Sequence, residues 1–316
     1  MKIVRNTLKY LVIALCIIIL ISTVGVEMIY TALLFNKHID YTSIKEPSQY
    51  GITAIEHDVT TEDNYRIHIY EVETEQPKAV VLYLSGIQQP SVTYFYSHSQ
   101  MLKENGYASI LIDVRGHGKS EGNRIDFGIE EVKDVQAVVD FVKEQDIYRD
   151  VPIVVHGVSM GGAIAVTSAS LIPEIDGLIA MSAFASWADV CKMELGHMGY
   201  NSTIQEIAAP FIHINGFWRY GFDYFNNRPK EAIKQIGDKP TFIMHAYGDT
   251  TVPIENMYKI KENHNGKNLH IWVRPSSAHL VVEGNKIADP FSDTEYCTNV
   301  LSFLEKYFGN NDIGEN

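Results

Sequence analysis

The chain has 316 residues, of which 46% are hydrophobic and 21% are charged. This composition is ordinary for a globular protein, and the length suffices for one large α/β domain with a deep core. The formal net charge of −13 argues against binding to nucleic acid, because like charges would repel the phosphates.

The N-terminal part of the chain is strongly apolar. Residues 10–26 carry no charged side chain, and as a helix this run would span roughly 26 Å, close to the thickness of the hydrocarbon layer of a bilayer. Lys2, Arg5 and Lys9 precede the run without any acidic residue. We therefore predict that residues 1–36 form a transmembrane anchor in the cell membrane, with the N-terminus cytoplasmic and the rest of the chain outside.

The alternative interpretation is a signal peptide that is cleaved, so that the rest of the chain is secreted. Its apolar core would be unusually long, and Thr23-Val-Gly25 is a poor cleavage site. A lipoprotein signal at Cys16 is weaker still, because the bulky Leu15 precedes the cysteine and strongly apolar sequence follows it.

After a polar linker at residues 37–49, a regular alternation of elements begins. Two alternating apolar–polar segments predict an antiparallel hairpin at a sheet edge, and strands and helices then alternate, as in βαβ units with a mostly parallel sheet. One domain over residues 50–316 is expected. The hairpin strands are expected at 52–59 and 65–72, the later strands near 79–84, 108–113, 151–156, 177–182, 240–246 and 269–274, and the helices near 94–105, 130–145, 160–171, 254–263 and 293–308.

One long segment, about residues 185–236, interrupts the alternation and is rich in aromatic residues. We predict a helical insertion here that covers the site as a lid. The aromatics could simply pack the insertion onto the body, but their surplus is compatible with an apolar pocket. The candidate pocket residues are Trp187, Phe217, Trp218 and Phe225.

The most informative motif is Gly157-Val-Ser-Met-Gly161. It follows an apolar β-branched run and precedes a helix-forming run, which predicts a strand, a sharp turn and a helix with Ser159 at the apex. The glycines allow close approach of the backbone, so the hydroxyl can stand clear of the sheet. Ser159 is therefore the candidate nucleophile; the alternative is a purely structural turn.

A serine nucleophile needs a histidine base and a carboxylate that orients the histidine. Asp249 follows the strand expected at 240–246, and His279 follows the strand expected at 269–274. We predict that both act with Ser159. The alternative acids Asp238 and Asp289 follow strand ends less cleanly, whereas His156 and His245 are expected in the core or beside the site.

With these motifs the chain resembles the α/β-hydrolase family from about residue 50 to residue 308. A further matching segment, Asp113-Val-Arg-Gly-His-Gly-Lys-Ser120, is similar to a loop of the monoacylglycerol lipase, lysophospholipase and serine aminopeptidase branches. The resemblance implies the α/β-hydrolase fold, a mostly parallel sheet flanked by helices with a lid. It also implies catalysis by Ser159, His279 and Asp249. For the Asp113 segment we prefer a structural role, with Arg115 and His117 tying neighbouring loops together.

The oxyanion hole of such an enzyme consists of two backbone N–H groups. Met160, directly after the nucleophile, is expected to supply one, and Ile87, on the loop after the strand at 79–84, the other. This loop begins with Ser85-Gly86 where relatives carry His-Gly, and Gln88 is the alternative donor to Ile87.

The sequence therefore predicts a membrane-anchored serine hydrolase that cleaves carboxylic esters, with a small-molecule or lipid-like substrate. The alternatives are a serine peptidase, an acyltransferase and a non-catalytic binding protein on a hydrolase scaffold. No metal, cofactor or obligate protein partner is expected, because the chain has neither a Cys/His cluster with ligand spacing nor a nucleotide-binding motif. Cys191 and Cys297 could pair only if the fold brings them together.

Overall fold

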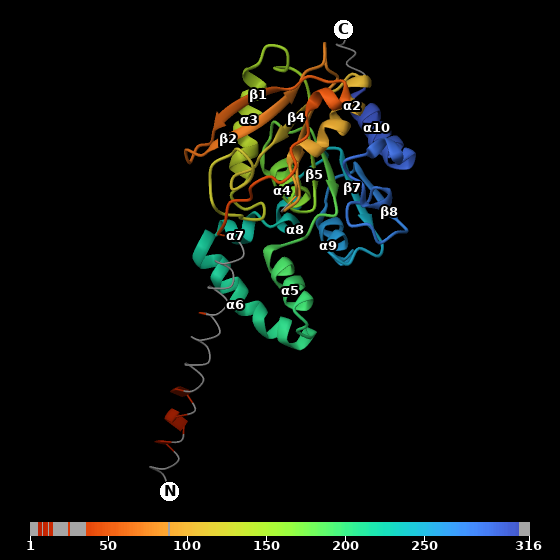
Figure 1. Cartoon of the computed structure of the whole chain (residues 1–316). Coiled ribbons are helices and arrows are strands. Elements are labelled where there is room, and N and C mark those ends of the chain that lie inside the picture. The colour runs from red at the N-terminus through yellow and green to blue at the C-terminus, as the bar shows by residue number, and fades with distance from the viewer. Residues whose placement is uncertain are drawn as a thin grey trace.

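The expected alternation of strands and helices forms a single sheet (Figure 1). The computed structural model describes residues 6, 7, 9–11, 13, 14, 25, 36–87 and 89–309. Within these residues the sheet has eight strands in the order β1-β2-β4-β3-β5-β6-β7-β8. They are β1 (Ile55–Thr60), β2 (Arg66–Val72), β3 (Val80–Leu84), β4 (Ala108–Ile112), β5 (Ile153–Val158), β6 (Gly177–Met181), β7 (Thr241–Ala246) and β8 (Leu269–Arg274).

The prediction of a mostly parallel sheet with an antiparallel edge hairpin is confirmed. β1 pairs with β2 and β2 with β4 in antiparallel fashion, whereas every pairing from β4 through β3, β5, β6 and β7 to β8 is parallel. The central strands β3, β4, β5 and β6 are buried along their whole length, as expected for strands with helices on both faces. Their parallel arrangement brings the carboxyl ends of β5, β6 and β7 to one edge of the sheet, where the candidate site residues follow.

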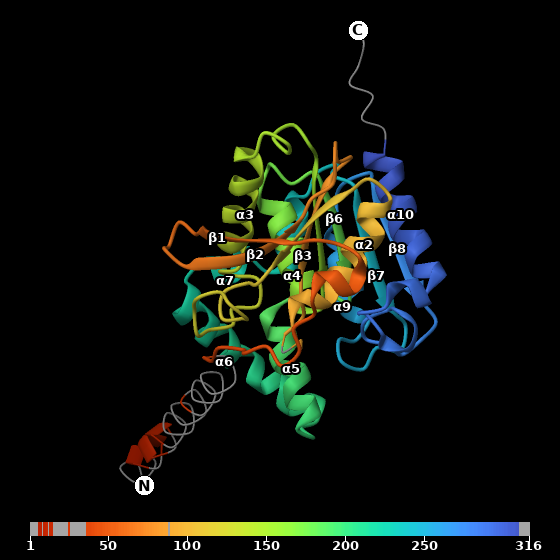
Figure 2. The same ribbon diagram turned by 45° about the horizontal axis from the view of Figure 1, so that its top comes forward.

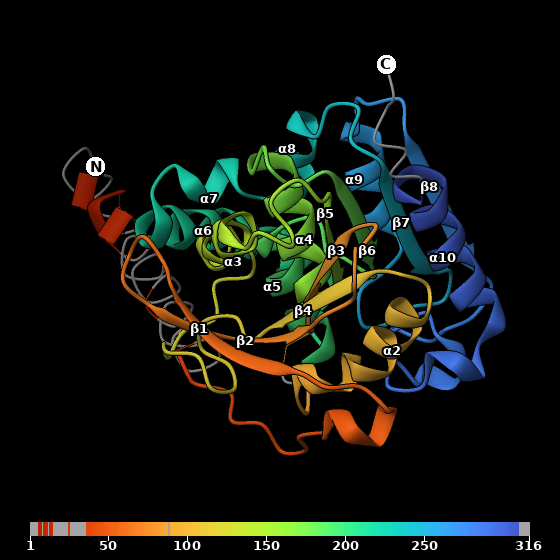
Figure 3. The ribbon, with the colours of Figure 1, turned by 90° about the horizontal axis from the view of Figure 1, so that it is seen from above.

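Helices cover both faces of the sheet, which gives two apolar cores. α2 (Tyr96–Glu104) and α10 (Thr294–Phe308) lie on one face, and α3 (Val132–Glu144), α4 (Met160–Leu171) and α9 (Glu255–Asn263) lie on the other (Figure 3). The buried side chains form one cluster under each set of helices. The short helical turns are η1 (Pro47–Tyr50), η2 (Val92–Phe95), η3 (Ile233–Gln235), η4 (Glu283–Asn285) and η5 (Pro290–Ser292).

The predicted insertion between β6 and β7 is helical. It contains α5 (Trp187–His197), α6 (Ser202–Tyr220), α7 (Asp223–Asn226) and α8 (Pro229–Ala232). α5 and α6 project from the body of the domain, and Figure 2 shows them below the sheet from a second direction. They contact each other.

The structure describes little of the predicted membrane anchor. Most of residues 1–36 lie outside the described residues. Within the part of the chain that the structure describes, no helix has both the length and the apolar character needed to cross a bilayer. The anchor stays a prediction.

Candidate active site

Ser159 lies at the sharp turn between β5 and α4. Its backbone angles are φ 57° and ψ −116°, a conformation that costs free energy for a residue with a side chain. Such strain persists only where the surroundings enforce it. Here β5 ends directly before Ser159, and α4 begins directly after it. The predicted strand, turn and helix are therefore present, with the serine at the apex.

Three glycines make this turn possible. A Cβ atom on Gly157 would lie 1.9 Å from the carbonyl oxygen of Gly161, and one on Gly161 would lie 2.2 Å from that of Leu84. A Cβ atom on Gly162 would lie 2.7 Å from the carbonyl oxygen of Met181. Because all three neighbours are backbone atoms, a larger residue at 157 would open the turn itself, and larger residues at 161 and 162 would force it away from the ends of β3 and β6.

The loop after β3 passes directly over the serine. A Cβ atom on Gly86 would lie 3.3 Å from the Cβ atom of Ser159. Met160 is the first residue of α4, so its N–H has no acceptor within the helix and points out at the helix N-terminus. Ile87 is partly buried on the same loop, and Gln88 lies outside the described residues. The loop and the helix N-terminus flank Ser159 as an oxyanion hole requires.

Asp249 and His279 meet at the carboxyl ends of β7 and β8. The Nδ1 atom of His279 lies 2.7 Å from Oδ2 of Asp249. Since a carboxylate only accepts hydrogen bonds, Nδ1 carries the proton and Nε2 is left as the basic nitrogen. The other carboxylate oxygen accepts the N–H groups of Thr251 and Val252 at 2.8 and 3.0 Å. The acid is thus buried, fully bonded and fixed in orientation.

The alternative acids lie elsewhere. Oδ1 of Asp238 accepts the N–H of Lys267, and Asp289 is exposed before η5. Of the three aspartates that the sequence nominated, Asp249 is the one bonded to His279.

Two residues that the sequence analysis did not assign to the site hold it together. The hydroxyl of Ser182, directly after β6, donates to the carbonyl oxygen of His279. The N–H of Ser159 donates to the carbonyl oxygen of Met181 at 2.8 Å. The backbones of Ser159 and His279 are therefore linked through two adjacent residues. Only the position of Ser182 at a strand end could have signalled this role.

Among the hydrogen bonds of the described residues, none joins the Ser159 hydroxyl to the His279 ring. In the absence of substrate such catalytic hydrogen bonds are often long and tighten only in the Michaelis complex. Ser159 is 8% exposed and the side chain of His279 is 14% exposed, so each keeps only a small solvent-accessible surface.

His245 is a second histidine beside the acid. Its Nε2 atom donates to the carbonyl oxygen of Val252 at 2.8 Å and lies 3.6 Å from Oδ2 of Asp249. Burial lowers the pKa of His245, so this ring is neutral near neutral pH. It lies beside the acid as a neutral ring while His279 keeps its bond to Asp249, which agrees with the predicted place in the core or beside the site.

The loop that contains Asp113 and Ser120 has structural contacts. Arg115 is buried and forms ion pairs with Asp63 at 2.8 Å and Asp134 at 2.7 Å. Burial lowers the pKa of His117 to about 4, and its Nδ1 atom lies 3.2 Å from the carbonyl oxygen of Arg115. These bonds tie the loop to the β1–β2 turn and to α3, as the sequence analysis preferred.

The predicted pocket aromatics occupy different environments. Trp187 is 2% exposed and packs edge-on against Phe127 at 4.9 Å between ring centres, so it belongs to the core. Phe225 is partly buried against Phe217. Trp218 is 81% exposed. These residues therefore differ in burial, and their place around one pocket stays a prediction.

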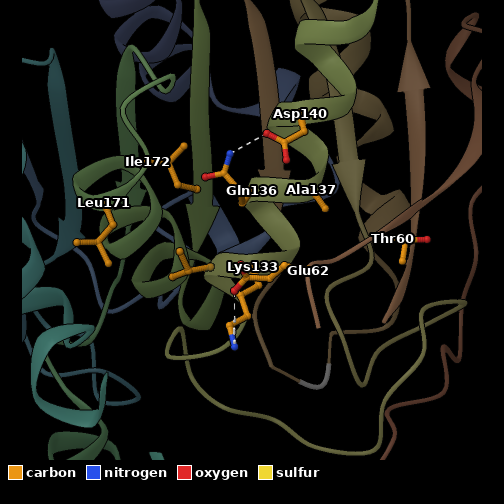
Figure 4. Close-up of a pocket in the computed structure, with 9 residues that line it drawn as sticks. Thr60, Glu62, Lys133, Gln136, Ala137, Asp140, Leu171 and Ile172 are labelled. Carbon is orange, nitrogen blue, oxygen red and sulfur yellow. Dashed lines mark hydrogen bonds and ion pairs between the residues drawn. The ribbon is translucent and has the colours of Figure 1, made fainter. Parts of the chain in front are cut away.

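A groove of about 280 Å³ lies elsewhere, between α3, the end of β1 and the end of α4 (Figure 4). Lys133, Gln136 and Asp140 line it, and Gln136 donates to Asp140 at 2.8 Å. Leu171, at its rim, is the last residue of α4, and a helix of 12 residues is about 18 Å long. The groove is therefore separate from Ser159, which precedes the other end of α4.

Cys191 and Cys297 do not form a disulfide with each other. Among the described residues, no group of three or more histidine, cysteine or acidic side chains is placed to hold a metal ion.

Known proteins resemble this chain in sequence and in fold. A family model described as serine aminopeptidase, S33, matches residues 75–211, a range that includes Ser159 and ends before Asp249 and His279. The YqkD protein of Bacillus subtilis is 23% identical over 234 residues, which cover 73% of this chain and 70% of that protein. The monoglyceride lipase of Mus musculus is 31% identical over 172 residues, 54% of this chain and 53% of the lipase.

Among solved structures, an esterase of Pyrococcus furiosus superposes with a TM-score of 0.69 at 21% identity. The match covers 87% of this chain and 99% of the esterase. At this level of identity the likeness establishes the fold, and the chemistry has to be argued from the site.

Proposed function

Since the chain belongs to the α/β-hydrolase superfamily, we propose that it is a serine hydrolase that cleaves carboxylic esters through Ser159, His279 and Asp249. The observation that carries the proposal is the bond between His279 and Asp249 at the sheet edge where the strained Ser159 also lies. A purely structural turn would need neither the strain nor a buried carboxylate aimed at a histidine.

The geometry supports an acyl-enzyme mechanism. The oxygen of Ser159 attacks the ester carbonyl while Nε2 of His279 takes the hydroxyl proton, and Asp249 stabilises the imidazolium that forms. The N–H groups of Met160 and Ile87 bind the negative oxygen of the tetrahedral intermediate. The protonated His279 then gives its proton to the leaving alcohol. Water, activated by the same ring, releases the acid and restores Ser159.

A second candidate is cleavage of amides, because the matching family model is described as serine aminopeptidase. The same residues would act, and protonation of the leaving amine by His279 would become more demanding. Acyl transfer to an alcohol also uses this arrangement and would appear as product partitioning when alcohols are added. Because monoglyceride lipases and an esterase are among the similar proteins, we favour esters.

The choice is tested with p-nitrophenyl esters of increasing acyl length against aminoacyl p-nitroanilides. We expect kcat/KM to be higher for the esters and to rise with acyl length, because each buried methylene contributes about 0.8 kcal/mol. Turnover that persists in Ser159→Ala protein is subtracted as contamination. Faster turnover of the anilides would overturn the assignment to esters.

The outer face of α6 supports a place at a membrane. An apolar stripe at alternating spacings of three and four residues runs along this helix and consists of Ile204, Ile207, Phe211, Ile214 and Trp218. All of its members except the half-buried Phe211 are exposed. An exposed stripe of this length is unfavourable in water and suits contact with a lipid surface or a lipid-like substrate.

We infer that residues 1–36 anchor the chain in the cell membrane, with the N-terminus cytoplasmic and the catalytic domain outside. Asn36 lies beside the insertion, where its side chain accepts a hydrogen bond of 2.6 Å from Arg219 at the end of α6. Asn36, the last residue of the predicted anchor, is thereby bonded to the helix that carries the apolar stripe. N-terminal sequencing of protein from the membrane fraction is expected to begin at or near Met1. A new N-terminus after about residue 25 would instead support cleavage and secretion.

A further inference from the structure

The segment that precedes the domain crosses two loops on the active-site side. We name residues 38–45 the strap. At its first end, the N–H of Ile39 donates to the carbonyl oxygen of Gly116 at 2.7 Å, and the N–H of Gly118 donates back to the carbonyl oxygen of Ile39 at 3.0 Å. Both nitrogens of the His38 ring lie within 3.0 Å of carbonyl oxygens of the same loop. The strap therefore pairs with this loop like a short added strand.

Tyr41 fixes the middle of the strap. Its hydroxyl donates to Oδ1 of the buried Asp113 at 2.6 Å, and the other oxygen of Asp113 accepts the N–H of Lys119 at 2.9 Å. Burial raises the pKa of Asp113 to about 6, so the carboxylate is charged above that pH and accepts both bonds. A Cβ atom on Gly118 would lie 2.4 Å from the Tyr41 ring, which shows how closely the ring fits the loop.

The far end of the strap holds a different loop. The N–H groups of Thr42 and Ser43 donate to the carbonyl oxygen of Pro90 at 3.0 and 3.3 Å. The N–H of Lys45 donates to the hydroxyl oxygen of Thr93 at 2.8 Å. Pro90 ends the loop that begins at Ser85, passes over Ser159 and carries the candidate oxyanion donor Ile87. Since proline has no N–H, the backbone of Pro90 can form hydrogen bonds only through its carbonyl oxygen.

We propose that the strap is a positioning element of the reaction, which holds the oxyanion loop in its active geometry through the bonds of Thr42 and Ser43 to Pro90. Of this loop, the structure describes residues 85–87, 89 and 90. This proposal rests on the proposed serine-hydrolase function. An oxyanion donor stabilises the transition state only when it is oriented beforehand. If it had to reorient during the reaction, the free energy of reorientation would cancel the free energy that its hydrogen bond supplies. The bond from Tyr41 to the buried Asp113 also holds the strap in a fixed position.

Two substitutions in the full-length protein test the strap. Thr42→Pro removes one N–H that binds Pro90, and Tyr41→Phe removes the hydroxyl and keeps the ring. The matched controls are Thr53→Pro, an exposed position outside the strap whose amide donates no hydrogen bond in the described part of the chain, and Tyr50→Phe, whose hydroxyl makes none there either.

We expect kcat for a soluble p-nitrophenyl ester to fall about 10- to 100-fold in Thr42→Pro and roughly 3- to 10-fold in Tyr41→Phe, with KM unchanged and both controls near wild type. The inhibition constant of an alkyl boronic acid, which forms a tetrahedral adduct with the serine, should rise by the same factor as kcat falls. Active sites are counted by fluorophosphonate titration, so that kcat refers to folded molecules.

A merely structural strap would lower the thermal midpoint and the number of active sites and leave kcat per site and boronate binding unchanged. Unchanged kcat per site and unchanged boronate binding in either Thr42→Pro or Tyr41→Phe would overturn the proposal. A change in KM alone would also overturn it. A wild-type chain without ester turnover would overturn the proposed function as well, whereas an active wild type with unaffected strap variants would overturn the strap alone.

Discussion

Replacing Asp249 by Asn is expected to lower kcat for ester hydrolysis about 10³- to 10⁴-fold. The amide oxygen of Asn can still accept the N–H groups of Thr251 and Val252, so the local fold should persist. The amide nitrogen, however, would face Nδ1 of His279 and favour the ring tautomer that carries its proton on Nε2. The ring then cannot take the proton of Ser159. Steady-state kinetics of purified protein measures the effect.

Asp289→Asn is the matched control. This aspartate is exposed, and it was an alternative acid on sequence grounds. Its replacement should leave kcat unchanged, and the thermal midpoints of both variants should match wild type. A loss of activity in Asp289→Asn that equals the loss in Asp249→Asn would contradict the assignment of the acid.

Gly161→Ala is expected to destabilise the protein by about 3 kcal/mol or more, at the upper end of the cost of overpacking. The new Cβ atom would lie 2.2 Å from the carbonyl oxygen of Leu84 and 2.6 Å from that of Ser85. Both are backbone atoms at the start of the oxyanion loop, so neither can swing aside. α4 would have to move away from β3 and take Ser159 with it. Urea unfolding measures the free energy, and ester turnover reports the displaced site.

Gly196→Ala provides the comparison in another helix. Its Cβ atom would lie 3.2 Å from Nε2 of Gln205, the end of a flexible side chain. Since alanine favours helix over glycine by up to about 1 kcal/mol, the stability should stay the same or rise. Equal destabilisation by the two alanines would mean that the contact with β3 does not determine the effect.

The parts of the site that could be predicted from sequence are those encoded locally. The apolar run before Gly157 and the small residues after it specify a strand, a turn and a helix within one continuous segment, and the structure has all three. Asp249 and His279 could be placed because each follows a strand of a parallel sheet, whose carboxyl ends necessarily meet at one edge.

What the sequence could not predict depends on contacts between distant segments. Nothing in the residue types of Thr42 and Ser43 indicates that their backbone amides bind Pro90, since any residue other than proline carries such an amide. The insertion shows a second limit. Trp187 and Trp218 are equally apolar, but one packs in the core and the other faces outward, because the side of a helix that meets the body depends on how the insertion docks.

The most direct test of the proposed chemistry is the site of covalent labelling by a fluorophosphonate, in which the serine oxygen displaces fluoride from phosphorus. Mass spectrometry of digested protein is expected to find the phosphonyl group on Ser159 in wild type, at a slower rate in Asp249→Asn, and nowhere in Ser159→Ala. Folded wild-type protein that stays unlabelled, or that carries the label on another residue, would contradict the account.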